Sequence, residues 1–283
     1  MHLQAVLREW GQRQTPTELE AVFERHSQLR KIVDSAGCVR GSAWWDSLTG
    51  EMLDVIGRAG LARESSAVAI AERISENMVP YPSRASVVDL LILAGDRSAI
   101  AGDSRKAVAF WERVPAGRAR SVQDRLLVTK SHLHAQNRVE SLLAGKKYAD
   151  ALVAVTEYKK ELPSVLRNLD NAGLQTAFRK EVVELETKVR QYVLLEHLVE
   201  IQEAFRDAQY DSTRRQILSD YERVVRASLR EAEPGYSRDR IWTNIAEPTG
   251  RNLRNFSSTP ASINPMIDEV LQSISRDMRT NSL

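Results

Sequence analysis

Histidine and cysteine are the residues of this chain best suited to bind a metal ion or attack a substrate, and their spacing limits what they can do. His132 and His134 are two residues apart, so on a helix their side chains point about 200° away from each other and cannot chelate one metal ion together. Cys38 follows His26 by twelve residues, and no pattern fixes the thiol beside the imidazole as an activated nucleophile. We expect isolated histidines and a buried, inert thiol.

Phosphate-binding and zinc-binding sequence motifs are also missing. The stretch Ala-Gly-Lys-Lys-Tyr at 144–148 lacks the first glycine and the hydroxyl residue of a phosphate loop, so it predicts a turn between two helices. The sequence contains no Gly-x-Gly-x-x-Gly and no His-Glu-x-x-His. It therefore predicts no catalytic residue, no metal site and no cofactor. An enzyme with a dispersed helical site is the least favoured hypothesis.

Basic residues outnumber acidic ones by ten to four between residues 102 and 147. Several of them fall in predicted interhelical loops, where they would gather along one edge of the fold. Such an edge could bind an acidic peptide, a phosphate group or RNA, or it could be an ordinary solvated face. We call this set the basic edge: Lys106, Arg113, Arg118, Arg120, Lys146 and Lys147.

Charge and hydropathy narrow the classes of partner. The chain has 283 residues, 40 basic and 38 acidic, and a net charge of +2, so nothing attracts it as a whole to nucleic acid or anionic membranes. Aromatic residues are few, which makes nucleic acid less favoured than a protein partner. Arg8 and Glu9 interrupt the first apolar run, and no stretch of about 18 apolar residues follows. We expect a cytoplasmic protein, and a single cysteine suits a reducing compartment.

Three similar octets indicate how the chain is organised. They are AVAIAERI at 67–74, AVAFWERV at 107–114 and ALVAVTEY at 151–158, and each follows a glycine by a short polar stretch. Glycine ends a helix in a left-handed cap, and an early alanine in the next helix lets two helices approach closely. Each octet therefore predicts the second helix of a hairpin, and hairpins must stack to bury their apolar faces.

The first helix of each hairpin is predicted at about 41–58, 86–99 and 124–143. VVDLLILAG at 87–95 is the most apolar stretch and should be central. An earlier pair is predicted at 2–10 and 16–35. Its second member begins at Thr15-Pro-Thr-Glu18, which has the pattern of a capping box.

These units resemble the tetratricopeptide class of helical repeat over about residues 41–163. The positions that match are Gly95, Ala107 and Trp111 in the second unit and Tyr148, Ala151 and Pro163 in the third. The chain departs from the pattern at Val139 and Tyr158, and its repeat spacing of 40 and 44 residues exceeds the family's, which is about 34. The resemblance implies an α-solenoid whose first helices form a partner-binding groove.

Within that groove the resemblance implies seven partner-binding positions: Trp44, Trp45, Asp89, Asp96, Lys130, His134 and Arg138. The two adjacent tryptophans diverge by about 100° on a helix, so they cannot be buried equally in one seam. One of them is then an exposed binding anchor, or the two fill different seams.

The second half of the chain has a different period. Apolar residues three or four positions apart form a seam that predicts one long helix at 173–208. They are Phe178, Val182, Leu185, Val189, Tyr192, Leu195 and Val199. Ile217, Tyr221 and Leu229 belong to a second helix at 212–232, which Glu-Pro-Gly-Tyr at 233–236 ends. A short polar link joins the two helices, so they should fold back on each other as a coiled-coil-like hairpin.

Residues 247–264 are rich in Ser, Thr, Asn, Pro and Gly, and they predict a polar linker. Within it Arg251, Arg254 and Phe256 could form a short recognition motif in an extended segment. A last helix at 265–279 follows, with Asn264 as its cap and an apolar stripe of Met266, Val270, Leu271 and Ile274. This tethered helix either docks on its own body or serves as an arm that binds a partner.

The sequence thus predicts an all-α protein in four parts. These are a tetratricopeptide-like solenoid at 1–163, a long helical hairpin at 164–246, the linker at 247–264 and the C-terminal helix and tail at 265–283. The predicted function is a non-enzymatic scaffold or adaptor that binds a protein partner, with an acidic one favoured by the basic edge. The first alternative is a self-associating structural subunit of a large viral, phage or secretion assembly, and the next is an RNA-binding or anion-binding helical protein.

Overall fold

The computed structural model describes residues 43–62, 66–77, 84–256 and 259–280, with Leu283 and a few single positions before residue 43. These residues form helices and the turns between them, and no strand is found among them. The all-α fold class is therefore confirmed. The predicted helix at 2–10, all but a few positions of the one at 16–35, and the cap at Thr15–Glu18 lie outside the described residues, as do His26 and Cys38.

The chain separates into two compact units, each of which is described by itself. The first unit comprises residues 1–133 and 166–177, and the second comprises residues 134–165 and 178–283. Helices α7 (Arg120–Ala144), α8 (Tyr148–Leu166) and α9 (Ala172–Asp207) each contribute residues to both units.

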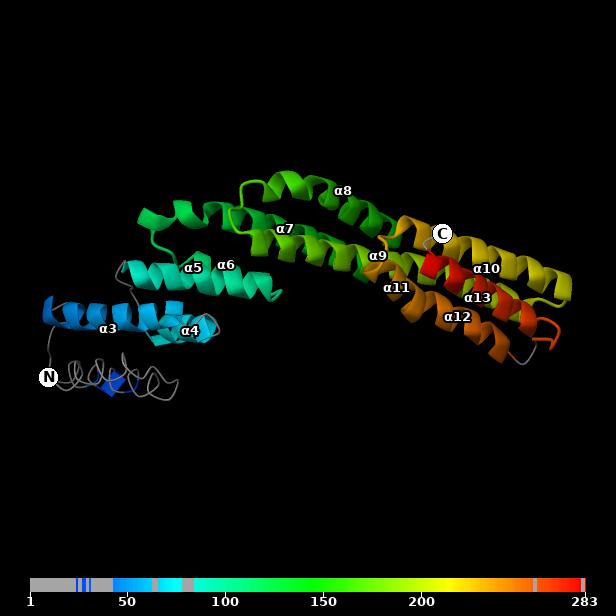
Figure 1. The fold of residues 1–283 in the computed structure, drawn as a ribbon, viewed down its shortest axis with the longest axis horizontal. Helices are drawn as coiled ribbons and strands as arrows, with labels where there is room; N and C mark the ends of the chain where they lie inside the picture. Colours follow the sequence, from blue (N-terminus) through cyan, green and yellow to red (C-terminus); the bar gives the residue numbers. More distant parts are fainter. Residues whose placement is uncertain are drawn as a thin grey trace. The chain divides into compact units, whose positions relative to one another are not determined.

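Four helices form most of the described part of the first unit. They are α3 (Ala43–Ala62), α4 (Ala67–Asn77), α5 (Ala85–Ile100) and α6 (Ser104–Trp111), followed by a 3-10 turn at Ala116–Arg118. Helix α5 packs against α3, α4 and α6 (Figure 1). Its apolar residues Val87, Val88, Leu90 and Leu91 are buried, so the prediction that 87–95 is central is confirmed.

The glycines before the octets do not all act as predicted. Gly102 adopts a left-handed φ of 86° and ends α5, as expected. Gly60 instead lies inside α3, where an added Cβ would stand 2.6 Å from Leu90 Cδ1, so it allows a close helix contact. At the third turn the left-handed residue is Lys146, with a φ of 56°, rather than Gly145.

The small residues of the octets are buried as predicted. Ala67, Ala107 and Ala151 have no exposed surface. Beside Ala107, the indole of Trp111 occupies the space next to Gly95, where an added Cβ would be 2.3 Å from Nε1. The same Nε1 donates a hydrogen bond of 3.3 Å to the carbonyl of Ile92. A bulky ring therefore fills the gap that a missing side chain leaves on α5.

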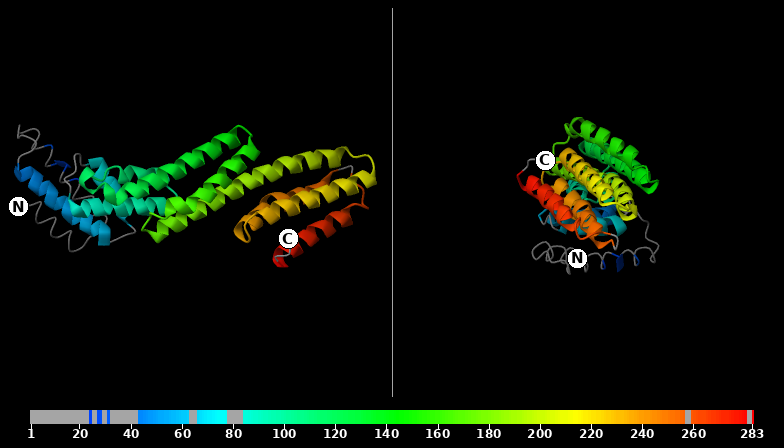
Figure 2. Two further views of the ribbon diagram at one scale, coloured as in Figure 1. Left: turned by 90° about the horizontal axis from the view of Figure 1, so that it is seen from above. Right: turned by 90° about the vertical axis from the view of Figure 1, so that its right-hand side faces the viewer.

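The second unit is built from the second half of α7, α8, most of α9 and the helices that follow it (Figure 2). These are α10 (Asp211–Glu231), α11 (Tyr236–Ile241), a π-helical turn (Trp242–Ala246), α12 (Glu247–Asn252), a 3-10 turn (Leu253–Asn255) and α13 (Asn264–Thr280). The helices predicted at 173–208, 212–232 and 265–279 are confirmed within one residue at each end. Gly235 has a φ of 81° in the predicted turn after α10.

The first half of the predicted apolar seam on α9 is confirmed. Phe178, Val182, Leu185 and Val189 are buried. Leu185 and Val189 join Ala151 and Val155 of α8 and Val139 of α7 in one apolar cluster. This half of α9 therefore faces the α7–α8 hairpin.

The prediction for the second half of that seam is wrong, because its residues are exposed. The exposed fractions are 39% for Tyr192, 38% for Leu195 and 43% for Val199. The buried residues are instead Leu194, Leu198 and Phe205, which join the core formed with α10 to α13. The step from Val189 to Leu194 is five residues, which rotates the buried face by about 140° beyond one full turn. Helix α9 therefore buries one side against α8 and a different side against α10 to α13.

The polar linker predicted at 247–264 is also corrected. Residues 247–252 form α12 and residues 253–255 form a 3-10 turn. Pro248 follows directly on the π-helical turn at Trp242–Ala246, so the helical run widens just before a residue that has no N–H to donate. Gly250 is buried against Tyr221, whose hydroxyl would be 2.5 Å from an added Cβ. Phe256 packs 6.4 Å from Phe205, measured between ring centroids. These contacts make the segment part of the core.

Helix α13 docks on its own unit. Ile267, Leu271 and Ile274 are buried in the core shared with α10, and Arg226 of α10 binds Asp277 and Ser273 of α13 at 2.5 and 2.8 Å. Asn264 does not make the predicted cap bond, because its Oδ1 has no partner among the described residues. None of the described helices combines the length and the apolar character that a bilayer span requires.

Candidate functional site

The seven predicted partner-binding positions fall into different environments. Asp89, Lys130, His134 and Arg138 are exposed, and Lys130 binds Glu112 at 2.6 Å. Asp89 and Lys130 belong to the first unit, whereas His134 and Arg138 belong to the second. The side chains of Trp44 and Trp45, on α3, lie outside the described part of the structure. The groove that these positions were expected to line stays a prediction.

Asp96 is not available to a partner, which corrects its predicted role. It is buried, with 7% of its surface exposed. Its Oδ1 accepts a 2.8 Å hydrogen bond from Arg125 Nε, and its Oδ2 accepts bonds from Arg125 Nη2 at 3.2 Å and from Asn171 Nδ2 at 2.9 Å. Burial by itself would lower the pKa of Arg125. The hydrogen bonds and charges of Asp96 and Asp170 have the larger effect, so the pKa lies above its ordinary value. This buried ion pair joins three segments of the first unit.

The basic edge is divided between the two units. Lys106, Arg113, Arg118 and Arg120 belong to the first unit, and Lys146 and Lys147 to the second. All except Lys106 are exposed, and Lys106 binds Glu72 at 2.5 Å. A single basic surface made of all six residues stays a prediction.

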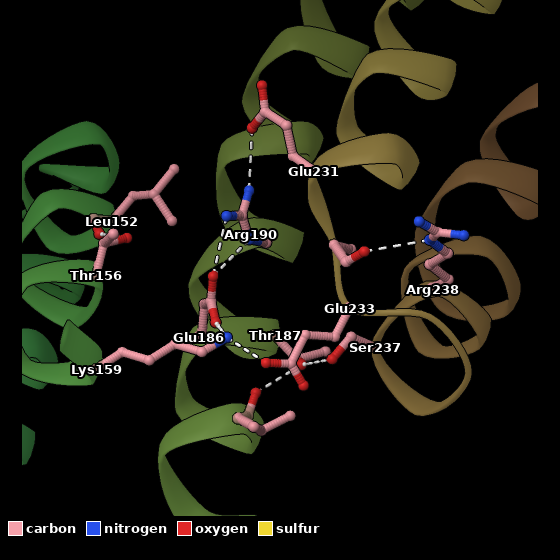
Figure 3. Close-up of polar contacts among 12 residues, drawn as sticks. Leu152, Thr156, Lys159, Glu186, Thr187, Arg190, Glu231, Glu233, Ser237 and Arg238 are labelled. Atoms are coloured by element: carbon pink, nitrogen blue, oxygen red, sulfur yellow. Dashed lines mark hydrogen bonds and ion pairs between the residues drawn. The ribbon is translucent and has the colours of Figure 1, made fainter. Parts of the chain in front are cut away.

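The largest cluster of charged side chains that we find in the second unit lies where α8, α9 and the end of α10 meet (Figure 3). Glu186 accepts hydrogen bonds from Lys159 at 2.7 Å and from Arg190 at 2.9 and 3.0 Å. Lys159 also binds Glu233, and Arg190 binds Glu231 at 3.1 Å. Burial by itself would raise the pKa of Glu186. The hydrogen bonds and charges of Lys159 and Arg190 have the larger effect, so the pKa lies below its ordinary value.

This cluster joins helices of the second unit through paired charges. Each of its charges is paired with an opposite charge of the same cluster. Beside it, the hydroxyls of Thr187 and Ser237 share a buried hydrogen bond of 2.7 Å (Figure 3). The ion pair of Lys159 with Glu186 fixes α9 against α8, and the bond between Thr187 and Ser237 fixes α9 against the start of α11. The described residues include no group of three His, Cys, Asp or Glu side chains placed to hold a metal ion.

Three exposed apolar residues of α9 form a candidate binding surface of the second unit. We call Tyr192, Leu195 and Val199 the α9 seam. At 100° per residue their side chains lie within about 60° of one another on the helix. Tyr192 stacks on Tyr148, the first residue of α8, with ring centroids 5.5 Å apart and planes inclined by 13°. The cover that α8 provides therefore stops at Tyr192, and Leu195 and Val199 extend the seam past it.

Sequence reasoning identified the residues of this seam but placed them in one continuous series with Val189. The signal that could have revealed their exposure is the second apolar series, Leu194, Leu198 and Phe205, which competes with the first on the same helix. Two series on one helix indicate two different partners for its two sides.

Comparison of the chain with protein families, with curated proteins and with solved structures finds no match.

Proposed function

We propose that this protein is a non-enzymatic interaction scaffold that binds a helix of a partner protein through the α9 seam. The observation that carries the proposal is the exposure of Tyr192, Leu195 and Val199, at 38–43%, on the side of α9 next to the one that the helix buries against α8. An apolar stripe at helical spacing that continues beyond its own cover is suited to a second helix packed in the same way.

The charges around the seam indicate the chemistry of that partner helix. Glu196 and Glu203 are exposed and lie on the seam side of α9, within about 60° of Val199, and Arg206 on the same side is paired with Asp207. A partner helix that covers the seam would bring its flanking residues close to these carboxylates. We therefore propose an amphipathic partner helix with Lys or Arg beside its apolar stripe.

Repeated hairpins would suit such a scaffold. Within the first unit, the pairs α3–α4 and α5–α6 correspond to two of the units that resemble tetratricopeptide repeats, and we propose that they stack in that manner. Stacked hairpins present extended surfaces that bind other proteins. An acidic partner on the basic edge would be a further contact of the same scaffold.

Charge introduced into the seam is expected to abolish partner capture. The chain carrying Leu195→Glu and Val199→Glu is compared with the unaltered chain by cross-linking and affinity purification. The amount of partner recovered should fall by about tenfold or more, because two unpaired carboxylates would be buried at the interface. Quantitative mass spectrometry measures the recovery. The matched control is Leu127→Glu, which changes a 64% exposed leucine of α7, and it should keep full capture.

The same experiment separates the scaffold from the alternative function. A scaffold returns a different protein whose recovery depends on Leu195 and Val199. A structural subunit of a large assembly returns further copies of this chain, which sedimentation of the purified protein would detect. Equal recovery of all proteins with the seam variant and with Leu127→Glu contradicts the proposal, provided that circular dichroism shows both variants to be folded.

A further inference from the structure

A second surface of the second unit has a strongly basic character. A hollow of about 770 Å³ lies along α12, the 3-10 turn and α13. Four arginines line it, together with two carboxylates, three neutral polar residues and two apolar ones. They are Arg251, Arg254, Arg276, Arg279, Glu247, Asp268, Asn255, Gln272, Ser275, Trp242 and Leu271. We call this hollow the arginine groove.

One wall of the groove is a continuous face of α13. The lining residues of this helix follow one another at steps of one or three, and they are Asp268, Leu271, Gln272, Ser275, Arg276 and Arg279. Such spacing places them on one side of a helix. Ile267 and Ile274 are buried in the core of the unit instead. The amphipathic pattern that docks α13 therefore also directs its polar face to the groove.

The arginines of the groove are of two kinds. Arg251 is paired with Glu247 at 2.5 Å, and Arg254 is paired with Asp268. Arg276 and Arg279 are exposed, and within the described residues neither forms an ion pair. The lining therefore has an excess of two positive charges, four arginines against two carboxylates, and the excess belongs to the last turns of α13.

The groove is held in shape by contacts behind it. Arg226 ties α10 to Asp277 and Ser273 of α13. The hydroxyl of Tyr221 donates a hydrogen bond of 2.7 Å to the carbonyl of Ala246, just before α12. Both walls are thereby fixed on α10, so a ligand need not order them on binding.

We propose that the arginine groove binds an acidic segment of a partner protein in an extended conformation. The lining face of α13 from Asp268 to Arg279 is about 16 Å long at 1.5 Å per residue. An extended chain advances about 3.3 Å per residue, so about five residues fill that length. Guanidinium groups bind carboxylates through two parallel hydrogen bonds, which are stronger than neutral ones. The unpaired Arg276 and Arg279 would bind two acidic side chains of the segment.

Two features of the groove favour a protein segment over a nucleic acid. Glu247 and Asp268 lie in the lining, where they would repel a continuous line of phosphates, whereas a peptide can place neutral residues beside them. Trp242 is the only aromatic residue of the lining and is 7% exposed, so its ring offers little surface on which a base could stack.

Peptide binding to the full-length protein tests this proposal. The probe is fluorescein-labelled hexaglutamate, followed by fluorescence anisotropy at low salt, with hexaglutamine and a six-nucleotide oligothymidine as comparison probes. The chain should bind hexaglutamate in preference to both. Arg276→Gln with Arg279→Gln should weaken that binding by about tenfold or more, because two charge-assisted contacts are lost.

The matched control removes the same charge elsewhere. Arg215 and Arg230 are exposed arginines of α10 outside the groove, and Arg215→Gln with Arg230→Gln should leave hexaglutamate binding unchanged. The proposal is overturned if hexaglutamate does not bind, if the two double variants lose binding equally, or if oligothymidine binds more tightly. The assay does not involve the α9 seam, so this site and the proposed scaffold function can fail separately.

Discussion

Replacing Val189 with proline is expected to lower the free energy of unfolding by about 3 kcal/mol or more and to reduce the helical circular dichroism signal. Val189 lies in the interior of α9 and is fully buried. Proline has no N–H to donate to the carbonyl one turn earlier, and its ring collides with that carbonyl. The substitution also removes apolar contacts with Ala151 and Val155. Urea titration followed by circular dichroism measures both effects.

The control places proline where α9 begins. Leu174 N–H donates to the side chain of Asn171 at 3.1 Å, so Asn171 caps the helix and Ala172 is its first residue. Proline is well tolerated at a first helical position, and Ala172→Pro should leave the urea midpoint nearly unchanged. If Val189→Pro unfolds at the same midpoint as Ala172→Pro, α9 is not continuous through Val189.

Removing the buried carboxylate of Asp96 is expected to cost about 3 kcal/mol. The side chains of Asp96 and Arg125 are only 10% and 12% exposed, so Asp96→Ala leaves a desolvated guanidinium whose remaining carboxylate partner is Asp170. That carboxylate is 78% exposed and is therefore a weak replacement. Asn171 also loses the acceptor of its amide. Urea unfolding of the first unit measures the loss.

Two further variants decide whether the pairing itself is the cause. Asp89→Ala removes an exposed carboxylate from the same helix, and its effect should stay within about 0.5 kcal/mol. Asp96→Leu combined with Arg125→Met replaces the pair by apolar side chains and should recover most of the stability. A midpoint for Asp96→Ala equal to that of Asp89→Ala would mean that the pair is not formed.

The positions of helices could be predicted more reliably than the sides they bury. Apolar spacing located α9 within one residue at each end, because spacing reports the local conformation of the chain. The same spacing put Leu195 in one apolar series with Val189. The chain alone does not show that α8 begins at Tyr148 and covers α9 no further, or that other helices cover the opposite side of α9. Which face is buried depends on partners far away in sequence.

Composition misled the prediction for residues 247–255 for a related reason. Pro248 and Gly250 are signals of a turn when taken alone. In the structure Pro248 follows directly on a π-helical turn, and Gly250 lies where Tyr221 leaves no room for a side chain. The arginines of this segment were recognised as candidates, but their groove was not, since its other wall comes from α13.

Asp96 shows the same limit for polar residues. An aspartate on a helix is usually solvated, and nothing near it in sequence indicates Arg125, which is 29 residues away, or Asn171, which is 75 residues away. Its burial depends on those two distant partners.

The central claim, that α9 turns its buried face between Val189 and Leu194, can be measured by the accessibility of single thiols. With Cys38, the only natural cysteine, replaced by serine, Leu194, Leu195, Leu198 and Val199 are each changed to cysteine. Reaction with a coloured disulfide reagent is followed at low protein concentration. Thiols at 195 and 199 should react quickly, and those at 194 and 198 at least about tenfold more slowly, because they must wait for local opening. Slow reaction at 195 and 199 with fast reaction at 194 and 198 would contradict the account.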